Sequence, residues 1–187
     1  MQDITALSTE QLVERFATLP CPTIDELDGE YDAKLLRQPN LPAALSGRLA
    51  VDNPLSPWQA KAFRPVDEET GRGYNTFRRL GRTVQRYPMH TMIAPSRFDG
   101  LPAYQLIYRA YESLCGTINM VDEVRRIADG TYLGIGTWGF TDAQRAIALP
   151  FLLEGPVRPY RRDIGSPRTD FTITRRELPG LTAGDRR

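Results

Sequence analysis

Histidine and cysteine are scarce in this sequence. His90 is the single histidine, and Cys21 and Cys115 lie far apart, without the spacing of metal ligands. A zinc site built from histidine and cysteine is therefore not expected, and we predict neither a metal nor an organic cofactor. Two unpaired thiols fit a reducing compartment, so the predicted location is the cytoplasm.

Long apolar runs and an excess of one charge are also missing. The net charge is +1, whereas surfaces that bind nucleic acids usually carry a strong basic excess. No apolar run reaches about eighteen residues, and the first residues lack the basic and apolar regions of a signal peptide. We therefore expect no nucleic-acid partner and no membrane span.

The familiar catalytic motifs are absent as well. The sequence contains no G-x-G-x-x-G, no phosphate-binding P-loop, no H-E-x-x-H and no G-x-S-x-G. A reaction therefore cannot be assigned by motif, and only the fold and single residues indicate a function.

The clearest structural signal is the stretch 117–140. Two runs rich in β-branched residues, 117–127 and 131–140, flank Ala128-Asp129-Gly130. Glycine takes positive φ without strain and aspartate bonds its own backbone, so these three residues predict the turn of a β-hairpin.

Short β-like runs continue on both sides of this hairpin, separated by turn residues. They lie at 28–36, 58–65, 74–80, 83–94, 103–114 and 149–157, with one late run at 171–175. Spacings near ten residues indicate an antiparallel sandwich or barrel. Pro88 within one run predicts an edge strand or a bulge, and an edge could pair with a second copy in a homodimer.

Helical signals lie mainly near the start of the chain. Ser8 and Gln11 have the spacing of a capping box for a helix at 8–18, and leucines favour a second helix near 42–50. Thr141 or Asp142 could cap a helical turn at 141–148. We predict a single β-barrel domain with an N-terminal helical segment over 1–165, and a partly mobile C-terminal extension over 166–187.

Three stretches carry motifs in a recognisable order. The run 27–33 (LDGEYDA) has the form of a G-x-W-x-G strand opener, with Tyr31 in place of the tryptophan and Ala33 in place of the second glycine. The run 58–63 (WQAKAF) has the form W-x-G-K-x-F, with Ala60 replacing the glycine. The run 122–127 (DEVRRI), followed by Leu133-Gly134, has the form D-x-F-R-x-V and then L-G.

In this order the three stretches resemble the bacterial GXWXG family of lipocalin-like proteins, over residues 27 to 140. The resemblance implies a mainly β fold, an antiparallel, calycin-like β-barrel with an internal cavity, to which the helical signals described above add short N-terminal helices. It implies a fold more than an activity.

Asp122 is the first candidate for chemistry. Its strand face otherwise carries Ile118, Met120 and Val124, so an inward orientation would place a carboxylate among apolar side chains. Arg126 on the same face, or a tyrosine of a neighbouring strand, would be its partner. The alternative is a structural ion pair that closes one end of the barrel.

Two further groups of residues extend the candidate site. His90, Tyr104 and Tyr108 could complete an acid–base set with Asp122, although a lone histidine is more often a hydrogen-bonded wall residue. The candidates for ligand contact are Trp58, Lys61, Phe63, Met120, Arg126 and Trp138. Ordinary packing in the barrel is the alternative for the aromatic residues, and solvent exposure is the alternative for Lys61.

Three classes of function remain open at this point. The preferred one is a protein that binds a small hydrophobic or amphiphilic metabolite in the barrel. The second is a cofactor-independent enzyme, such as a cyclase, isomerase or hydrolase. The third is a structural module that pairs through an edge strand.

Overall fold

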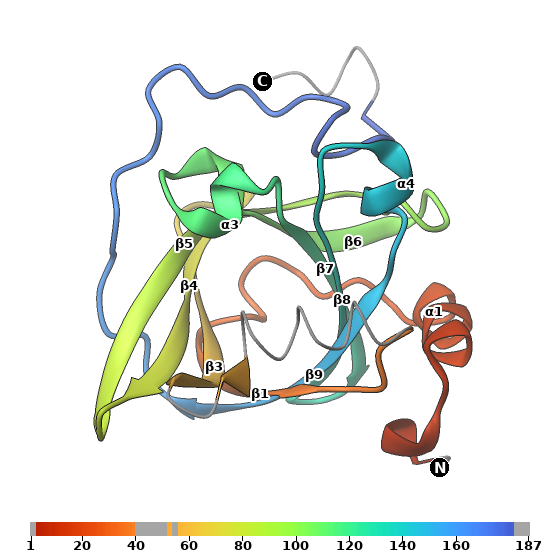
Figure 1. Cartoon of the computed structure of the whole chain (residues 1–187), viewed down its shortest axis with the longest axis horizontal. Helices are drawn as coiled ribbons and strands as arrows, with labels where there is room; N and C mark the ends of the chain where they lie inside the picture. Colours follow the sequence, from red (N-terminus) through yellow and green to blue (C-terminus); the bar gives the residue numbers. More distant parts are fainter. Residues whose placement is uncertain (1–2, 40–51, 54–55, 182–187) are drawn as a thin grey trace.

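The computed structural model describes residues 3–39, 52–53 and 56–181, and most of these residues form a closed antiparallel β-barrel (Figure 1). Eight strands form the barrel wall: each pairs with the wall strand that follows it in the chain, and the first also pairs with the last, which closes the barrel. The strands are β1 (Gly29–Leu35), β3 (Ser56–Pro65), β4 (Thr70–Arg79), β5 (Arg82–Pro95), β6 (Pro102–Ile107), β7 (Val121–Ala128), β8 (Thr131–Thr137) and β9 (Leu149–Arg158). A short strand, β2 (Asp52–Asn53), adds to β3. The predicted fold class, a mainly β barrel of calycin-like form, is confirmed.

The helices are short and lie between strands or before the first one. They are η1 (Ile4–Ala6), α1 (Thr9–Ala17), η2 (Tyr108–Ala110), α3 (Leu114–Thr117) and α4 (Asp142–Arg145). The predicted capping box is present at α1, where the side chains of Ser8 and Gln11 each accept from the other's backbone N–H. Thr141 caps α4 in the same way. The predicted helix at 42–50 lies outside the described residues.

Three predicted strands are wrong in extent or absent. The run 103–114 is a strand only to Ile107, because η2 and α3 then carry the chain across one end of the barrel. The run 117–127 begins with the end of α3, whose start is capped by the Ser113 side chain. The late run at 171–175 forms no strand. In each case the local β propensity yields to the need to turn the chain.

The inner face of the barrel contains the main apolar core. Its buried members include Tyr31, Phe63, Met89, Tyr104, Leu106 and Val124, which alternate along their strands with outward-facing residues. The segment between α1 and β1 closes one end, since Ile24 and Leu27 pack into this core. Figure 1 shows this segment passing behind the strands.

The outer face is covered in two places. Leu12 and Phe16 of α1 pack against Leu133, Ile135 and Leu152 of β8 and β9. The chain after β9 runs along the outside of the wall, as Figure 1 shows, and its buried residues Leu178 and Leu181 pack against β6 and β7. The described part of the C-terminal segment is therefore attached to the barrel, and the predicted domain division at 165 stays a prediction.

Pro88 lies at a bulge of β5. The pairing of β5 with β4 shifts by one residue between Gly73 and Asn75, and Tyr87 takes a φ of 54° there. The predicted bulge is confirmed. Strand β5 pairs with β4 on one side, and with β6 on the other side only from His90 to Pro95, so the part that contains Pro88 has no β6 partner. A homodimer stays a prediction. Among the described helices, none combines the length and apolarity that crossing a membrane requires.

Candidate functional site

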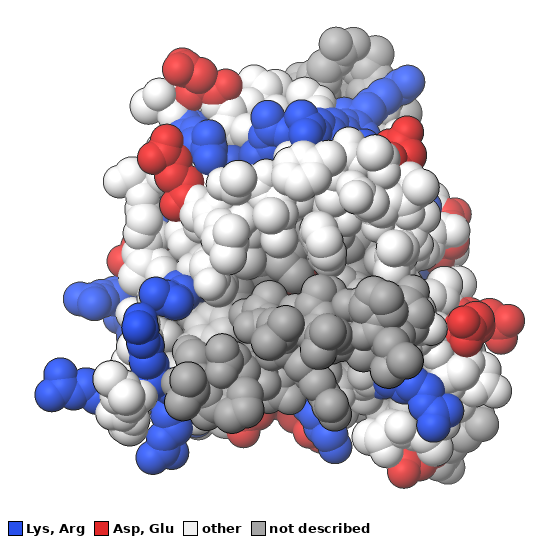
Figure 2. Space-filling model, in the orientation of Figure 1, with Lys and Arg blue, Asp and Glu red and all other residues white. Residues whose placement is uncertain are grey.

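A cavity of about 270 Å³ lies at the end of the barrel opposite the segment that closes it. The ends of β1, β4 and β8 and the starts of β3, β5, β7 and β9 contribute to its wall, together with η2 and α3. Most of the lining is apolar, and includes Leu35, Phe77, Ile118, Met120, Leu149 and Phe151. In the view of Figure 2, few charged side chains lie in the middle of the described surface. Most of the charged side chains lie toward the edges of this face.

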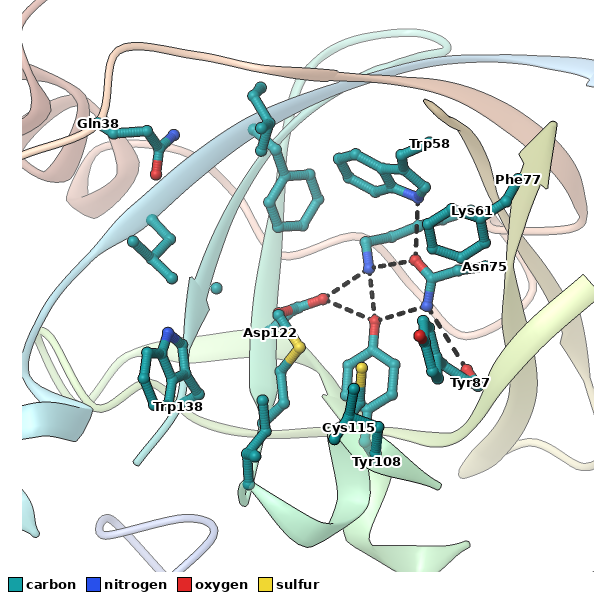
Figure 3. Close-up of a pocket in the computed structure, with 17 residues that line it drawn as sticks. Gln38, Trp58, Lys61, Asn75, Phe77, Tyr87, Tyr108, Cys115, Asp122 and Trp138 are labelled. Carbon is teal, nitrogen blue, oxygen red and sulfur yellow. Dashed lines mark hydrogen bonds and ion pairs between the residues drawn. The ribbon is translucent and has the colours of Figure 1, made fainter. Parts of the chain in front are cut away.

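A polar network lies in this otherwise apolar wall (Figure 3). The Nζ of Lys61 donates to Oδ2 of Asp122 at 2.7 Å, to Oδ1 of Asn75 at 3.0 Å and to the hydroxyl of Tyr108 at 2.5 Å. Trp58 donates its indole N–H to the same Asn75 oxygen at 3.1 Å. Side chains from β3, β4, β7 and η2 thus converge on one ammonium group.

The hydrogens of this network are fully used. Lys61 has three and donates all of them to the three partners named above. Tyr108 accepts from Lys61 and from the Asn75 amide at 3.0 Å, and donates to Oδ2 of Asp122 at 2.9 Å. The predicted role of Lys61 in binding a ligand carboxylate therefore conflicts with the structure, since no ammonium hydrogen remains.

One atom of the network is left over. Asp122 is 1% exposed, and its Oδ1 has no hydrogen-bond partner among the described residues. A Cβ added at Gly136 on β8 would lie 2.8 Å from this oxygen, so the glycine leaves room beside it. Both residues line the cavity.

The ammonium group of Lys61 is surrounded by aromatic rings. Its Nζ lies 5.1 Å from the ring centroids of both Trp58 and Phe151, and 5.3 Å from that of Tyr108. Ring faces stabilise a desolvated cation. A compact ammonium can direct three hydrogens from one atom at three converging acceptors, whereas the planar fork of arginine cannot. This explains a lysine at this position in a chain that otherwise favours arginine.

Burial holds two further groups of the cavity in their neutral forms. Burial, and then the negative charge of Asp122, raise the pKa of Tyr108 well above its usual value, so its hydroxyl keeps its proton. Burial also raises the pKa of the Cys115 thiol to about 12. Cys115 is therefore a poor nucleophile at neutral pH.

The structure brings six of the ten predicted site residues together. Trp58 and Lys61 of β3, Tyr108 of η2, Asp122 of β7, and the flanking Met120 and Trp138 all line the cavity. Figure 3 shows the Asp122 carboxylate between Lys61 on one side and Trp138 on the other. Ligand binding by these residues, and a catalytic role for them, remain predictions.

Two predicted residues lie deeper in the barrel than the cavity. Tyr104 is fully buried, and its hydroxyl lies 2.9 Å from that of Thr91. Phe63 packs against Tyr104 and Tyr31 with ring centroids 5.9 and 5.8 Å apart. Both belong to the core of the closed half, which corrects the predicted place of Tyr104 beside Asp122 and the predicted place of Phe63 in the cavity wall.

His90 lies on the outer face of the barrel. Its neighbours Met89 and Thr91 face inward, so strand alternation turns His90 outward, opposite Arg72 in the sheet. Burial lowers the pKa of its imidazole, which is therefore neutral at physiological pH. Its predicted role beside Asp122 is wrong.

Arg126 faces the opposite end of the barrel from the cavity. It shares a strand with Asp122, but four residues of strand span about 13 Å. Its guanidinium pairs with Glu26 at 3.1 Å, where the segment before β1 closes the barrel. Arg126 is therefore wrong as the partner of Asp122, whereas the alternative partner, a tyrosine, is confirmed for Tyr108, and Lys61 supplies the positive charge.

Several residues that line the cavity were not predicted from the sequence. Asn75 and Phe77 alternate along β4, and a polar side chain at an inward position of a β-run is a signal that could have identified Asn75. Tyr87 reaches the cavity through its left-handed backbone at the bulge, for which the sequence contains no comparable signal. In the described part of the chain, no three His, Cys, Asp or Glu side chains gather as a metal site requires.

Comparison with known proteins supports the fold alone. No protein-family model and no curated protein matches the chain. A crystal structure of a protein from Thermomonospora curvata is similar, with 15% sequence identity, a TM-score of 0.50, and coverage of 79% of this chain and 87% of that chain. The resemblance to the GXWXG family stays a prediction.

Proposed function

We propose that the protein binds one small, mostly apolar or amphiphilic molecule in the cavity of its barrel. The observation that carries this proposal is the wall itself: apolar side chains and aromatic rings surround one polar network that has no net charge. Cavities that bind small molecules are typically apolar with a few convergent polar groups. The volume lies near the lower end of their range of about 300–1,000 Å³, so the proposed ligand is small.

Burial of apolar surface would supply most of the binding free energy. Each square ångström of apolar surface removed from water contributes about 25 cal/mol. The aromatic rings add flat contact area at little cost in conformational entropy. The polar network would then contribute more to the orientation of the ligand than to its affinity.

Intrinsic fluorescence provides a direct test, because both tryptophans of the chain, Trp58 and Trp138, line the cavity. Titration with octanol or toluene should change their emission and raise the melting temperature. Ile118→Phe should weaken this response by filling the cavity. Ile93→Phe is the control, since Ile93 is 39% exposed and lies outside the lining. A wild-type protein that responds to no apolar probe would refute binding.

A cofactor-independent cyclase, isomerase or hydrolase is the second candidate. The observation that favours it is a protonated Tyr108 hydroxyl that donates to Oδ2 of Asp122, while Oδ1 of the same carboxylate has no partner among the described residues. Such a pair could take a proton from one substrate atom and return it to another. Molecules that co-purify with the protein would then be converted on renewed incubation with wild type and left unchanged by Asp122→Asn. Equal conversion by both proteins would exclude this role.

A further inference from the structure

The unpartnered oxygen of Asp122 is an unusual feature of the cavity. Oδ2 of the same carboxylate accepts from Lys61 and Tyr108, whereas Oδ1 accepts from no described residue although the side chain is almost fully buried. A buried acceptor without a donor loses the hydrogen bonds that water would supply, so such atoms are rare unless a further partner is present. The atom belongs to a residue that lines the cavity.

The residue opposite this oxygen has no side chain. Asp122 pairs with Gly136 across β7 and β8, and any larger side chain there would meet Oδ1. Trp138 directly follows the end of β8, two residues beyond Gly136, and lines the cavity. Because Asp122 itself belongs to the cavity lining, a group bound in the cavity lies beside this carboxylate.

The charges of the network restrict what that group can be. Lys61 and Asp122 neutralise each other, and all hydrogens of Lys61 and Tyr108 are already donated. An anionic head group would meet a carboxylate oxygen and find no donor in this network. A cationic head group would add a second positive charge near a buried ammonium, with little water to screen the repulsion.

We infer that the ligand carries a neutral hydrogen-bond donor, a hydroxyl or an N–H group, which donates to Oδ1 of Asp122 while the rest of the molecule fills the apolar cavity. This inference rests on the proposed binding function and adds the class of ligand to it. The cavity thus selects uncharged alcohols or amides over carboxylic acids of the same size.

Isomeric probes separate the inference from the proposed function. Octanol and heptyl methyl ether have the same atoms and nearly the same apolar surface, but only octanol can donate a hydrogen bond. Tryptophan fluorescence should report binding of octanol at least about tenfold tighter than binding of the ether, with octanoate at pH 8 weaker than both. Equal affinities for octanol and the ether would overturn the inference and leave binding intact. No binding of either isomer would refute the proposed function itself.

Variants assign the preference to Asp122. Asp122→Asn keeps the shape and places either an amide donor or a weaker, uncharged acceptor at the Oδ1 position, so the preference for octanol should fall to less than about threefold. Glu123→Gln is the matched control, because Glu123 is also 1% exposed and faces the outer side of the same strand. It should keep the full preference. An unchanged preference in a folded Asp122→Asn protein would contradict the inference.

Gly136→Ala covers the case in which Asp122→Asn fails to fold. The added methyl group would crowd Oδ1 without changing any charge. It should reduce the affinity for octanol more than the affinity for the ether. Equal losses for the two probes would show that the oxygen makes no contact with the ligand.

Discussion

The two faces of β7 carry buried charges that have different surroundings. On the inner face, Asp122 takes part in one compact network beside the cavity. On the outer face, Glu123 accepts the backbone N–H of Arg97 at 2.9 Å, and Arg125 makes a bidentate pair with Asp99 at 2.6 and 2.8 Å. All three β7 residues are at most 1% exposed.

The difference shows that burial and an unpartnered atom do not by themselves identify a binding site. Oε2 of Glu123 also has no partner within the described ranges, but Glu123 is not part of the cavity lining. Arg125 donates to the backbone oxygens of Phe16, Leu101 and Pro102, which attaches the end of α1 to the barrel. The outer charges hold segments together, whereas the inner network faces space that a ligand can fill.

Removal of the inner cation should have the largest effect on stability. Lys61→Met leaves the carboxylate of Asp122 buried without its counter-charge, which should lower the free energy of unfolding by about 3–5 kcal/mol. Urea denaturation followed by circular dichroism measures this loss. The double variant Lys61→Met with Asp122→Leu should recover part of it, because no charge then remains buried. A single variant as stable as wild type would mean that Asp122 is neutral or exposed.

Removal of the outer cation should cost less and leave the cavity intact. Arg125→Met should lower the free energy of unfolding by about 2–4 kcal/mol, because Asp99 is partly exposed and can be solvated when its partner is lost. The affinity for octanol should stay at its wild-type value, whereas Lys61→Met should change it. A parallel loss of affinity in Arg125→Met would show that the two faces are coupled.

A change in the cavity wall without any change of charge should have an intermediate effect. A Cβ at Gly134 would collide with the ring of Phe151, which lines the cavity next to Trp58. Gly134→Ala should cost about 1–3 kcal/mol through overpacking, and should shift tryptophan emission and weaken octanol binding. Gly73→Ala is the control, since its Cβ would meet the backbone of Ala62 and the side chain of Met89 in the deeper core. It should destabilise the protein with no shift in emission.

Neutralisation of the outer carboxylate should have the smallest effect, and one that depends on pH. Burial raises the pKa of Glu123 above its usual value, so the unfolded chain ionises first as the pH rises. The protonated Glu123 carboxyl therefore favours the folded state. Its contribution to the free energy of unfolding is fully present below about pH 4 and is lost as the pH rises through the pKa of Glu123 in the folded state. Glu123→Gln removes the group that ionises, and with it this loss of stability at higher pH. The variant should therefore gain stability relative to wild type between pH 4 and pH 7. Thermal melts across this range measure the gain, and a constant difference would contradict it.

The fold could be predicted from local patterns to a large extent. The capping box at Ser8, the turn glycine at Gly130 and the period-2 alternation on the β-runs all act over a few residues, and each holds in the structure. The strand ends at 107 and 121 could not be predicted. They depend on where the chain must cross the end of the barrel, which is a property of the closed sheet.

The candidate site could be predicted in part. Asp122 stood out because a carboxylate on an apolar strand face is costly without a partner. The choice of Lys61 over Arg126 as that partner depends on the stagger of strands around the barrel, which places residues of β3 and β7 at the same depth. His90 was misplaced because the bulge at Pro88 and the register of β5 decide which side it faces.

The sequence by itself determined the alternation of apolar and polar residues, the turns and the helix caps, since these arise from interactions between residues close together in the chain. Only the tertiary structure decided that Lys61, Asn75, Tyr108 and Asp122 meet at one point beside the cavity and leave Oδ1 of Asp122 without a partner among the described residues. The physical reason is closure: a barrel brings strands that are distant in sequence to face one another across its interior, and no local pattern records which residues then lie at the same depth.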